Sequence, residues 1–165
     1  MDYNFYQNKF QSAISIILKK ELGDLKLKVS IGSVMESLAL KVYKSEWSSN
    51  PQSPLIANGR IFFSVWVNDK AIQENKIYYN IHALKLRELK GYKILSRNFA
   101  ERFREQFINN SDNWPNVSVQ YGPLTLMEGW IELKPDSIEK DTSQLVQKFL
   151  DISFIIDETL DHYKI

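Results

Sequence analysis

Two stretches dense in aromatic and β-branched residues, joined by a short polar segment, constrain this chain more than any other feature. They read Arg-Ile-Phe-Phe-Ser-Val-Trp-Val over residues 60–67 and Lys-Ile-Tyr-Tyr-Asn-Ile-His-Ala-Leu over residues 76–84. Residues of these types favour extended strands. The connection over 68–75 is too short for the crossover that parallel strands need, so it favours antiparallel pairing. The sequence therefore predicts a central antiparallel hairpin.

Further strands are predicted on either side of this hairpin. Residues 25–31 and 38–43 each alternate between apolar and polar side chains, and Gly32-Ser33 between them predicts a turn. Residues 45–58 contain two prolines and several small polar residues, which predicts a long loop that is mobile or functional. Near the other end of the chain, residues 117–121 and 124–133 predict another hairpin that turns at Gly122-Pro123.

Three helices are predicted from apolar residues that recur every three or four positions. The first should end near Gly23, the second should be capped by Ser96, and the third should begin with a capping box formed by Asp136 and Glu139. The apolar positions that define them are Phe10, Ala13, Ile14, Ile17 and Leu18, then Phe99, Phe103 and Phe107, then Leu145, Phe149, Ile152, Ile156 and Leu160. We expect all three stripes to face a hydrophobic core.

The order of these elements is helix, four strands, helix, two strands, helix. Short links between successive strands favour an α+β fold, with an antiparallel sheet of about six strands packed by three helices. A chain of 165 residues is close to the usual size of one domain, so we expect residues 1–165 to form a single globular domain.

Composition narrows the classes of function. The chain has no cysteine, which removes disulfides, thiolate metal sites and cysteine nucleophiles and favours a cytoplasmic location. The N-terminal residues lack a basic region followed by an apolar run, and no window is apolar enough to predict a membrane span. The glycine-rich phosphate loops, nucleophile elbows and metalloprotease motifs of common enzymes are also missing, so we expect no cofactor and favour a non-catalytic role.

Charge is balanced overall but uneven along the chain. Residues 85–105 hold seven basic and three acidic side chains, whereas residues 128–165 hold nine acidic and four basic ones. We expect these two segments to be neighbours that neutralise each other. A nucleic-acid-binding protein would instead use the basic segment over 85–104 for phosphates, with Trp66, Tyr78 or Tyr79 as stacking platforms for bases.

Two pairs of potential catalytic or metal-binding residues are weak signals. Glu158 and His162 lie four apart on the last predicted helix, but two ligands do not form a metal site. Glu128 and Glu132 share one face of a predicted strand, but strand spacing separates them by ~13 Å, too far for paired acid–base chemistry. Both pairs are better explained as solvated surface residues.

The strongest functional signal is a strand that is apolar on both sides. Residues 61, 63, 65 and 67 alternate with Phe62, Ser64 and Trp66, although an antiparallel sheet normally has one wet face. If the first set meets the helices, the second face carries aromatic side chains together with polar groups, as partner-binding surfaces do. The candidate partner- or ligand-binding residues on this face are Phe62, Trp66, Tyr78, Asn80, His82 and Trp130.

The leading hypothesis is therefore a non-catalytic interaction protein that uses this aromatic face to bind a protein partner or a second copy of itself. The alternative is a small-molecule-binding protein or enzyme with a pocket around His82, which would supply a general base or a ligand contact. A second alternative is nucleic-acid binding through the basic segment. A helix or the loop over 45–58 that covered the aromatic face would remove the leading hypothesis.

Overall fold

The computed structural model describes residues 1–165 as an α+β fold, built on one antiparallel sheet of five strands in the order β1-β2-β3-β4-β5. The strands are β1 (Lys28–Val34), β2 (Ser37–Tyr43), β3 (Arg60–Val67), β4 (Lys76–Leu84) and β5 (Thr125–Glu132). The helices are α1 (Tyr3–Ile16), α2 (Lys19–Asp24), α3 (Asp69–Gln73), α4 (Ser96–Phe107) and α5 (Ile138–His162). This confirms the predicted fold class and the central hairpin.

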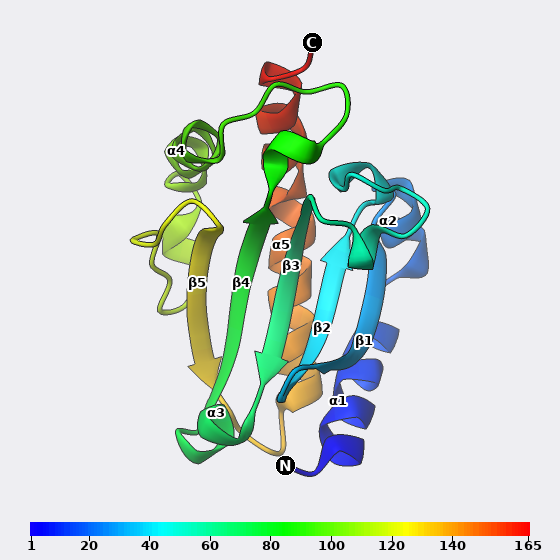
Figure 1. The fold of residues 1–165 in the computed structure, drawn as a ribbon. Helices are drawn as coiled ribbons and strands as arrows, with labels where there is room; N and C mark the ends of the chain where they lie inside the picture. Colours follow the sequence, from blue (N-terminus) through cyan, green and yellow to red (C-terminus); the bar gives the residue numbers. More distant parts are fainter.

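The long helices gather on one face of the sheet. Figure 1 looks onto the other face, with α5 crossing behind β3 and β4, α1 beside it behind β1 and β2, and α4 behind the upper end of β5. The helix-facing side chains of β3 and β4 are almost fully buried: Ile61, Phe63, Val65, Val67, Ile77, Tyr79, Ile81 and Ala83. Burial of this apolar layer against the helices supplies most of the driving force for folding.

The stripes predicted for the second and third helices form the core, whereas the prediction for the first helix was wrong at Leu18, which is 70% exposed. Phe99, Phe103 and Phe107 of α4 are fully buried, and every apolar position predicted for α5 is buried as well. Phe149 of α5 stacks on Phe63 of β3, with ring centroids 4.6 Å apart and planes at 4°. The stripes thus mark which side of each helix meets the sheet.

Several predicted boundaries were wrong. The first predicted helix breaks at Ile17 and Leu18, which are extended, because turning the chain there places Ile17 in the core. The turn between β1 and β2 lies at Met35-Glu36, since the pairing of Val34 with Ser37 carries β1 through Gly32 and Ser33.

Both predicted helix caps were also wrong. Ser96 is the first residue of α4 rather than its cap, and Leu95 precedes it without a side-chain capping bond. At the start of α5, Ser137 occupies the cap position and its hydroxyl donates to Asp141 at 2.7 Å. Glu139 forms an ion pair with Lys9 of α1 instead of folding back on the helix end. An interhelical contact therefore replaces the predicted local one.

The predicted strand over 117–121 is reduced to one bridge. Ser118 and Glu128 exchange both backbone hydrogen bonds, at 2.8 and 3.0 Å, beside the outer edge of β5. The chain then turns away, because the carbonyls of Tyr121 and Gly122 accept hydrogen bonds from the Arg104 guanidinium of α4. This contact accounts for five strands where about six were predicted.

The loop over 45–58 is anchored rather than free. Trp47 is 1% exposed and its Nε1 donates to Asp157 of α5 at 2.8 Å, while Lys44 forms an ion pair with the same carboxylate at 2.7 Å. Near its other end, Ser49 and Gly59 are joined by backbone and side-chain hydrogen bonds. The loop therefore borders the Arg60 end of β3 and leaves the rest of the sheet face uncovered (Figure 1).

We predict that Gly129→Ala destabilises the protein strongly. Gly129 of β5 lies under the buried ring of Tyr79, whose hydroxyl donates to the Pro115 carbonyl at 2.6 Å. A Cβ at Gly129 would overlap this ring and lie 2.9 Å from that carbonyl oxygen. Overpacking of this kind costs about 1–3 kcal/mol of unfolding free energy, measured by urea denaturation.

Gly32→Ala is the matched control for this substitution. Gly32 also lies within a strand, but a Cβ there would meet no atom within 4 Å. We expect its unfolding free energy to stay within about 0.5 kcal/mol of wild type. Equal stabilities for the two variants would contradict the packing described for Tyr79.

Candidate functional site

The sheet face opposite the helices, here called the open face, carries the residues predicted to form a site. Strand register sets them in rows that cross β3, β4 and β5: Phe62, His82 and Thr125; Ser64, Asn80 and Glu128; Trp66, Tyr78 and Trp130. The structure thus brings all six predicted site residues onto one face. No helix lies over them (Figure 1).

The aromatic row lies at the end of the sheet nearest α3. The rings of Trp66 and Tyr78 stack with centroids 4.8 Å apart and planes at 15°, and Trp130 is the strand partner of Tyr78 on the other side. All three side chains are partly exposed. Lys76 Nζ lies 4.4 Å from the centre of the Trp130 ring, and the Tyr78 hydroxyl donates to Glu74 at 3.1 Å. These neighbours fix the rings while leaving part of their surface exposed.

The middle row is a chain of hydrogen bonds. Ser64 Oγ donates to Asn80 Oδ1 at 2.7 Å, and Asn80 Nδ2 donates to Glu128 Oε1 at 3.2 Å. Ser64 and Asn80 are each 3% exposed, so their polar atoms need these partners. Asn80 is therefore a supporting residue of the open face and offers little surface for direct contact.

The third row surrounds Phe62 with nitrogen groups. Lys41 Nζ lies 4.6 Å from the centre of the Phe62 ring, Arg60 lies 5.6 Å from it, and the His82 ring is 5.4 Å away. These side chains leave Phe62 only 6% exposed. Cation–π attraction stabilises this arrangement. Phe62 therefore holds Lys41 and Arg60 in place more than it contacts a partner itself.

The surroundings of His82 favour its neutral form. Burial lowers its pKa, and the nearby positive charges of Lys41 and Arg60 lower it further, although the Leu124 carbonyl and Glu128 act in the opposite direction. Its Nδ1 lies 3.4 Å from the Leu124 carbonyl, which can only accept a hydrogen bond, and 3.3 Å from Thr125 Oγ1. A neutral ring that donates from Nδ1 has its unprotonated Nε2 available as an acceptor.

The pKa of Lys41 is also shifted by its surroundings. Burial lowers the pKa of its ammonium group, and the charge of Arg60 lowers it further. Neither Lys41 nor Arg60 takes part in an ion pair. Two neighbouring cations without a carboxylate partner favour an acidic group on whatever binds this part of the face.

A shallow hollow of about 350 Å³ lies on the open face beside these groups. Its lining includes Lys41, Phe62, Trp66, Asn80 and His82. Tyr78 and Trp130 were also predicted as site residues, but they do not line the hollow. They belong to the same row as Trp66, which does line it. His82 thus borders a depression whose volume lies near the lower end of the range for ligand pockets.

Other predicted residues lie elsewhere. Tyr79 is fully buried among aromatic rings of the core, so it cannot serve as a stacking platform. Glu158 and His162 lie on the last turns of α5, and no group of three or more potential metal ligands forms anywhere in the chain. None of the helices has both the length and the apolar character needed to cross a membrane.

The basic segment lies at the opposite end of the sheet from the aromatic row. Arg60 pairs with Leu84 at the end where residues 85–104 begin, whereas Trp66 and Tyr78 lie near the other end of the same strands (Figure 1). Tyr92 pairs with Lys164, so the segment is a neighbour of the acidic C-terminal helix as expected. No ion pair joins the two segments.

Sequence reasoning missed two basic residues of the open face. Lys41 alternates with apolar neighbours in β2, and Arg60 lies two residues before Phe62 in β3, so that the two side chains point to the same face. The alternation of side chains along each strand could therefore have identified both residues. What parity does not give is the register between β2 and β3, which sets Lys41 opposite Ser64 and beside Phe62.

Comparison with protein-family models, with curated proteins and with solved structures found no match for this chain.

We predict that His82 makes folding stability depend on pH. Because its pKa is lower in the folded protein than in the unfolded chain, the unfolded state binds protons more readily. The stabilisation is present above the unfolded pKa of about 6.5 and is lost as the pH falls below it. Urea unfolding between about pH 7.5 and about pH 5.5 should show a steeper loss of stability for wild type than for His82→Gln.

The control for this prediction is His162→Gln, because His162 is exposed near the end of α5. Its stability should fall with pH as steeply as that of wild type. A His82→Gln protein with the wild-type slope would show that the open face does not hold this ring neutral.

Proposed function

We propose that this chain is a non-catalytic interaction protein whose open face binds a second copy of itself. The observation that carries the proposal is the row formed by Trp66, Tyr78 and Trp130, which is ordered by stacking and strand pairing yet lies under no helix or loop. Aromatic side chains of this kind are enriched at the centres of protein interfaces, where they bury large area at low entropic cost.

Charge on the open face supports self-association. Lys41 and Arg60 lie on the β2–β3 side, while Glu74, Glu128 and Glu132 lie towards β4 and β5. A two-fold axis that passes through Tyr78 parallel to the strands would set the basic side of one copy against the acidic side of the other. Symmetric dimers require such a self-complementary patch.

The first test is the solution mass of the wild-type chain and of Trp66→Ala, measured by light scattering on a sizing column. We expect a dimer for wild type and a folded monomer for Trp66→Ala. Loss of one stacked aromatic pair should lower the unfolding free energy of the monomer by about 1 kcal/mol, far less than removal of a core tryptophan.

Phe154→Ala is the matched control, because Phe154 is a 50% exposed aromatic residue on α5, away from the open face. It should leave the dimer intact. A wild-type monomer at every concentration tested would refute self-association. An unfolded Trp66→Ala protein would show that Trp66 belongs to the core.

A small-molecule site is the second candidate function, favoured by the hollow beside His82. Its volume of about 350 Å³ lies near the lower end of the range for ligand pockets. Its cations and its aromatic rings, Phe62 and Trp66, suit a small aromatic anion. The unprotonated Nε2 of His82 would accept a hydrogen bond from such a ligand.

Benzoate is a suitable probe of this second candidate. We expect its addition to raise the melting temperature of wild type but not of Lys41→Met, which keeps the apolar stem and loses the charge. Benzylamine, which carries the opposite charge, should have no effect on either protein. Equal responses of the two proteins to benzoate would contradict a ligand site in the hollow.

A further inference from the structure

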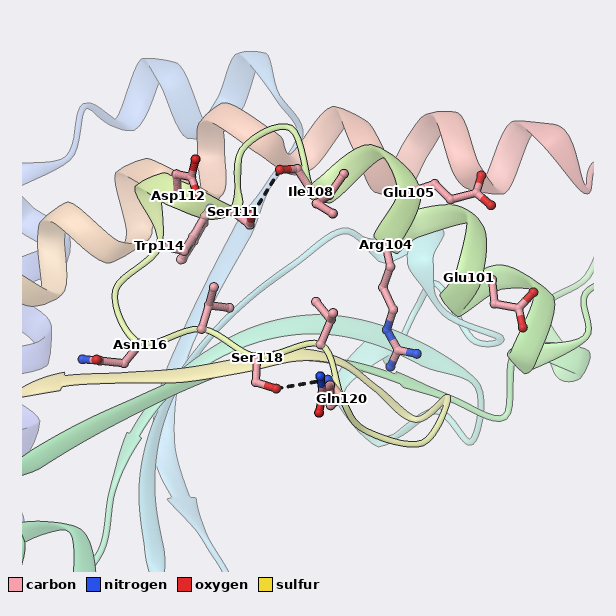
Figure 2. Close-up of a pocket in the computed structure, with 12 residues that line it drawn as sticks. Glu101, Arg104, Glu105, Ile108, Ser111, Asp112, Trp114, Asn116, Ser118 and Gln120 are labelled. Carbon is pink, nitrogen blue, oxygen red and sulfur yellow. Dashed lines mark hydrogen bonds between the residues drawn. The ribbon is translucent and has the colours of Figure 1, made fainter.

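A second surface lies on the other side of β5, between α4 and residues 111–120. It encloses a cleft of about 1010 Å³, at the upper end of the range for ligand pockets. Figure 2 shows α4 above the cleft, with Arg104 pointing down from it, and the segment that carries Asn116, Ser118 and Gln120 along the lower side. No sequence motif marks this cleft, and the open face does not include it.

Both walls of the cleft are fixed to the core. Trp114 is 3% exposed and packs against the rings of Phe63, Tyr79 and Phe107. On the α4 side, the Arg104 guanidinium donates to the carbonyls of residues 121, 122, 125 and 126 at 2.8 to 3.2 Å. The cleft is therefore largely preformed, which lowers the entropic cost of binding.

The lower wall presents an unpaired strand edge. Ser118 uses both its N–H and its C=O on Glu128 of β5, so in an extended chain the corresponding groups of Val117 and Val119 point away from β5. The Val117 N–H, the Val117 C=O and the Val119 N–H have no hydrogen-bond partner in the protein. Consecutive residues 116–120 all line the cleft, so the backbone edge borders it as well as one side-chain face.

The cleft also offers apolar contact and negative charge. Ile108, the residue directly after α4, is 70% exposed, Val119 of the lower wall is 36% exposed, and both line the cleft. Glu101, Glu105 and Asp112 line it too, and none of these carboxylates forms an ion pair. The only basic residue among the lining side chains, Arg104, is already occupied by backbone carbonyls.

We infer that this cleft binds an extended, basic peptide segment of a partner protein by strand addition. The peptide backbone pairs with the free groups of Val117 and Val119, continuing the sheet by one strand. Because side chains alternate along a strand, apolar residues at every second position would lie under α4 against Ile108 and Val119. Lysine or arginine residues in the peptide would meet the three free carboxylates.

The test uses a fluorescein-labelled peptide of alternating lysine and valine, with binding measured by fluorescence anisotropy. Wild type should bind it saturably, and the same peptide with glutamate in place of lysine should not bind. Addition of salt should weaken the binding, because exposed carboxylates contribute to it. Failure of wild type to bind the lysine peptide more tightly than the glutamate peptide would overturn the proposal.

Val119→Pro removes one of the free N–H groups and should weaken binding by about tenfold, as expected for loss of a hydrogen bond and obstruction of the edge. Val119→Thr keeps the N–H and a β-branched side chain, so it is the matched control and should bind nearly as well as wild type. Unchanged binding by a folded Val119→Pro protein would place the peptide elsewhere, for example on the edge of β1, and would overturn the proposal.

Two further measurements decide the outcome if Val119→Pro does not fold. N-methylation of alternate peptide amides blocks one backbone edge of the probe without changing its charge, so methylation of one edge should abolish binding to wild type, whereas methylation of the other edge should be tolerated. Amide hydrogen exchange at Val117 and Val119 should slow when the unmodified peptide is bound. Binding that tolerates methylation on either edge, with no protection of these amides, would identify adsorption by charge alone and overturn strand addition.

The carboxylates are tested by Glu101→Gln combined with Glu105→Gln and Asp112→Asn. This variant should bind the lysine peptide about tenfold more weakly at low salt and show a shallower dependence on salt. Glu158→Gln, on α5 outside the cleft, is the control and should bind as wild type does. Equal salt dependence of the triple variant and wild type would contradict the role of these carboxylates.

Discussion

One aromatic cluster centred on Phe63 holds the separate parts of this protein together. Phe63 of β3 stacks on Phe149 of α5, and its ring also contacts Trp114 and Tyr79. Trp47 reaches Phe149 from the loop over 45–58, and Phe107 of α4 reaches Trp114. Two long connections and two helices thus contact the centre of the sheet through these rings. Burial of the rings, and their edge-to-face and stacked contacts with one another, stabilise the fold.

This cluster also explains why the molecule is one-sided. Every ring in it lies on the helix-facing side of the sheet, so the helices, together with Trp47 and Trp114 of the two loops, are drawn to that side. The open face is left with side chains that satisfy one another through stacking, cation–π contacts and the chain from Ser64 through Asn80 to Glu128. An ordered face of this kind is compatible with binding because little conformational freedom remains to be lost.

Strand β5 links the two surfaces described above. The side chain of Glu128 accepts a hydrogen bond from Asn80 on the open face, while its backbone holds Ser118 beside the cleft. Gly129, next along the strand, leaves room for Tyr79, whose hydroxyl fixes Pro115 at the start of the same segment. Both surfaces therefore depend on how the outer strand is packed, although they face different directions.

The sequence by itself determined the α+β class, the central hairpin and the parity of its side chains, because alternation and helical periodicity are local consequences of burial on one side of an element. Parity alone was enough to group Phe62, Trp66, Tyr78, Asn80, His82 and Trp130.

Only the tertiary structure decided which of these residues are accessible, because the burial of Phe62 and Asn80 depends on Lys41, Arg60 and Glu128 from other positions along the chain. It also decided that Glu139 pairs with Lys9 instead of capping α5, and that residues 117–121 form a short bridge at Ser118 instead of a full strand, because contacts with Lys9 and Arg104 outweighed local preference. Such contacts join residues far apart in sequence, and no local pattern records them.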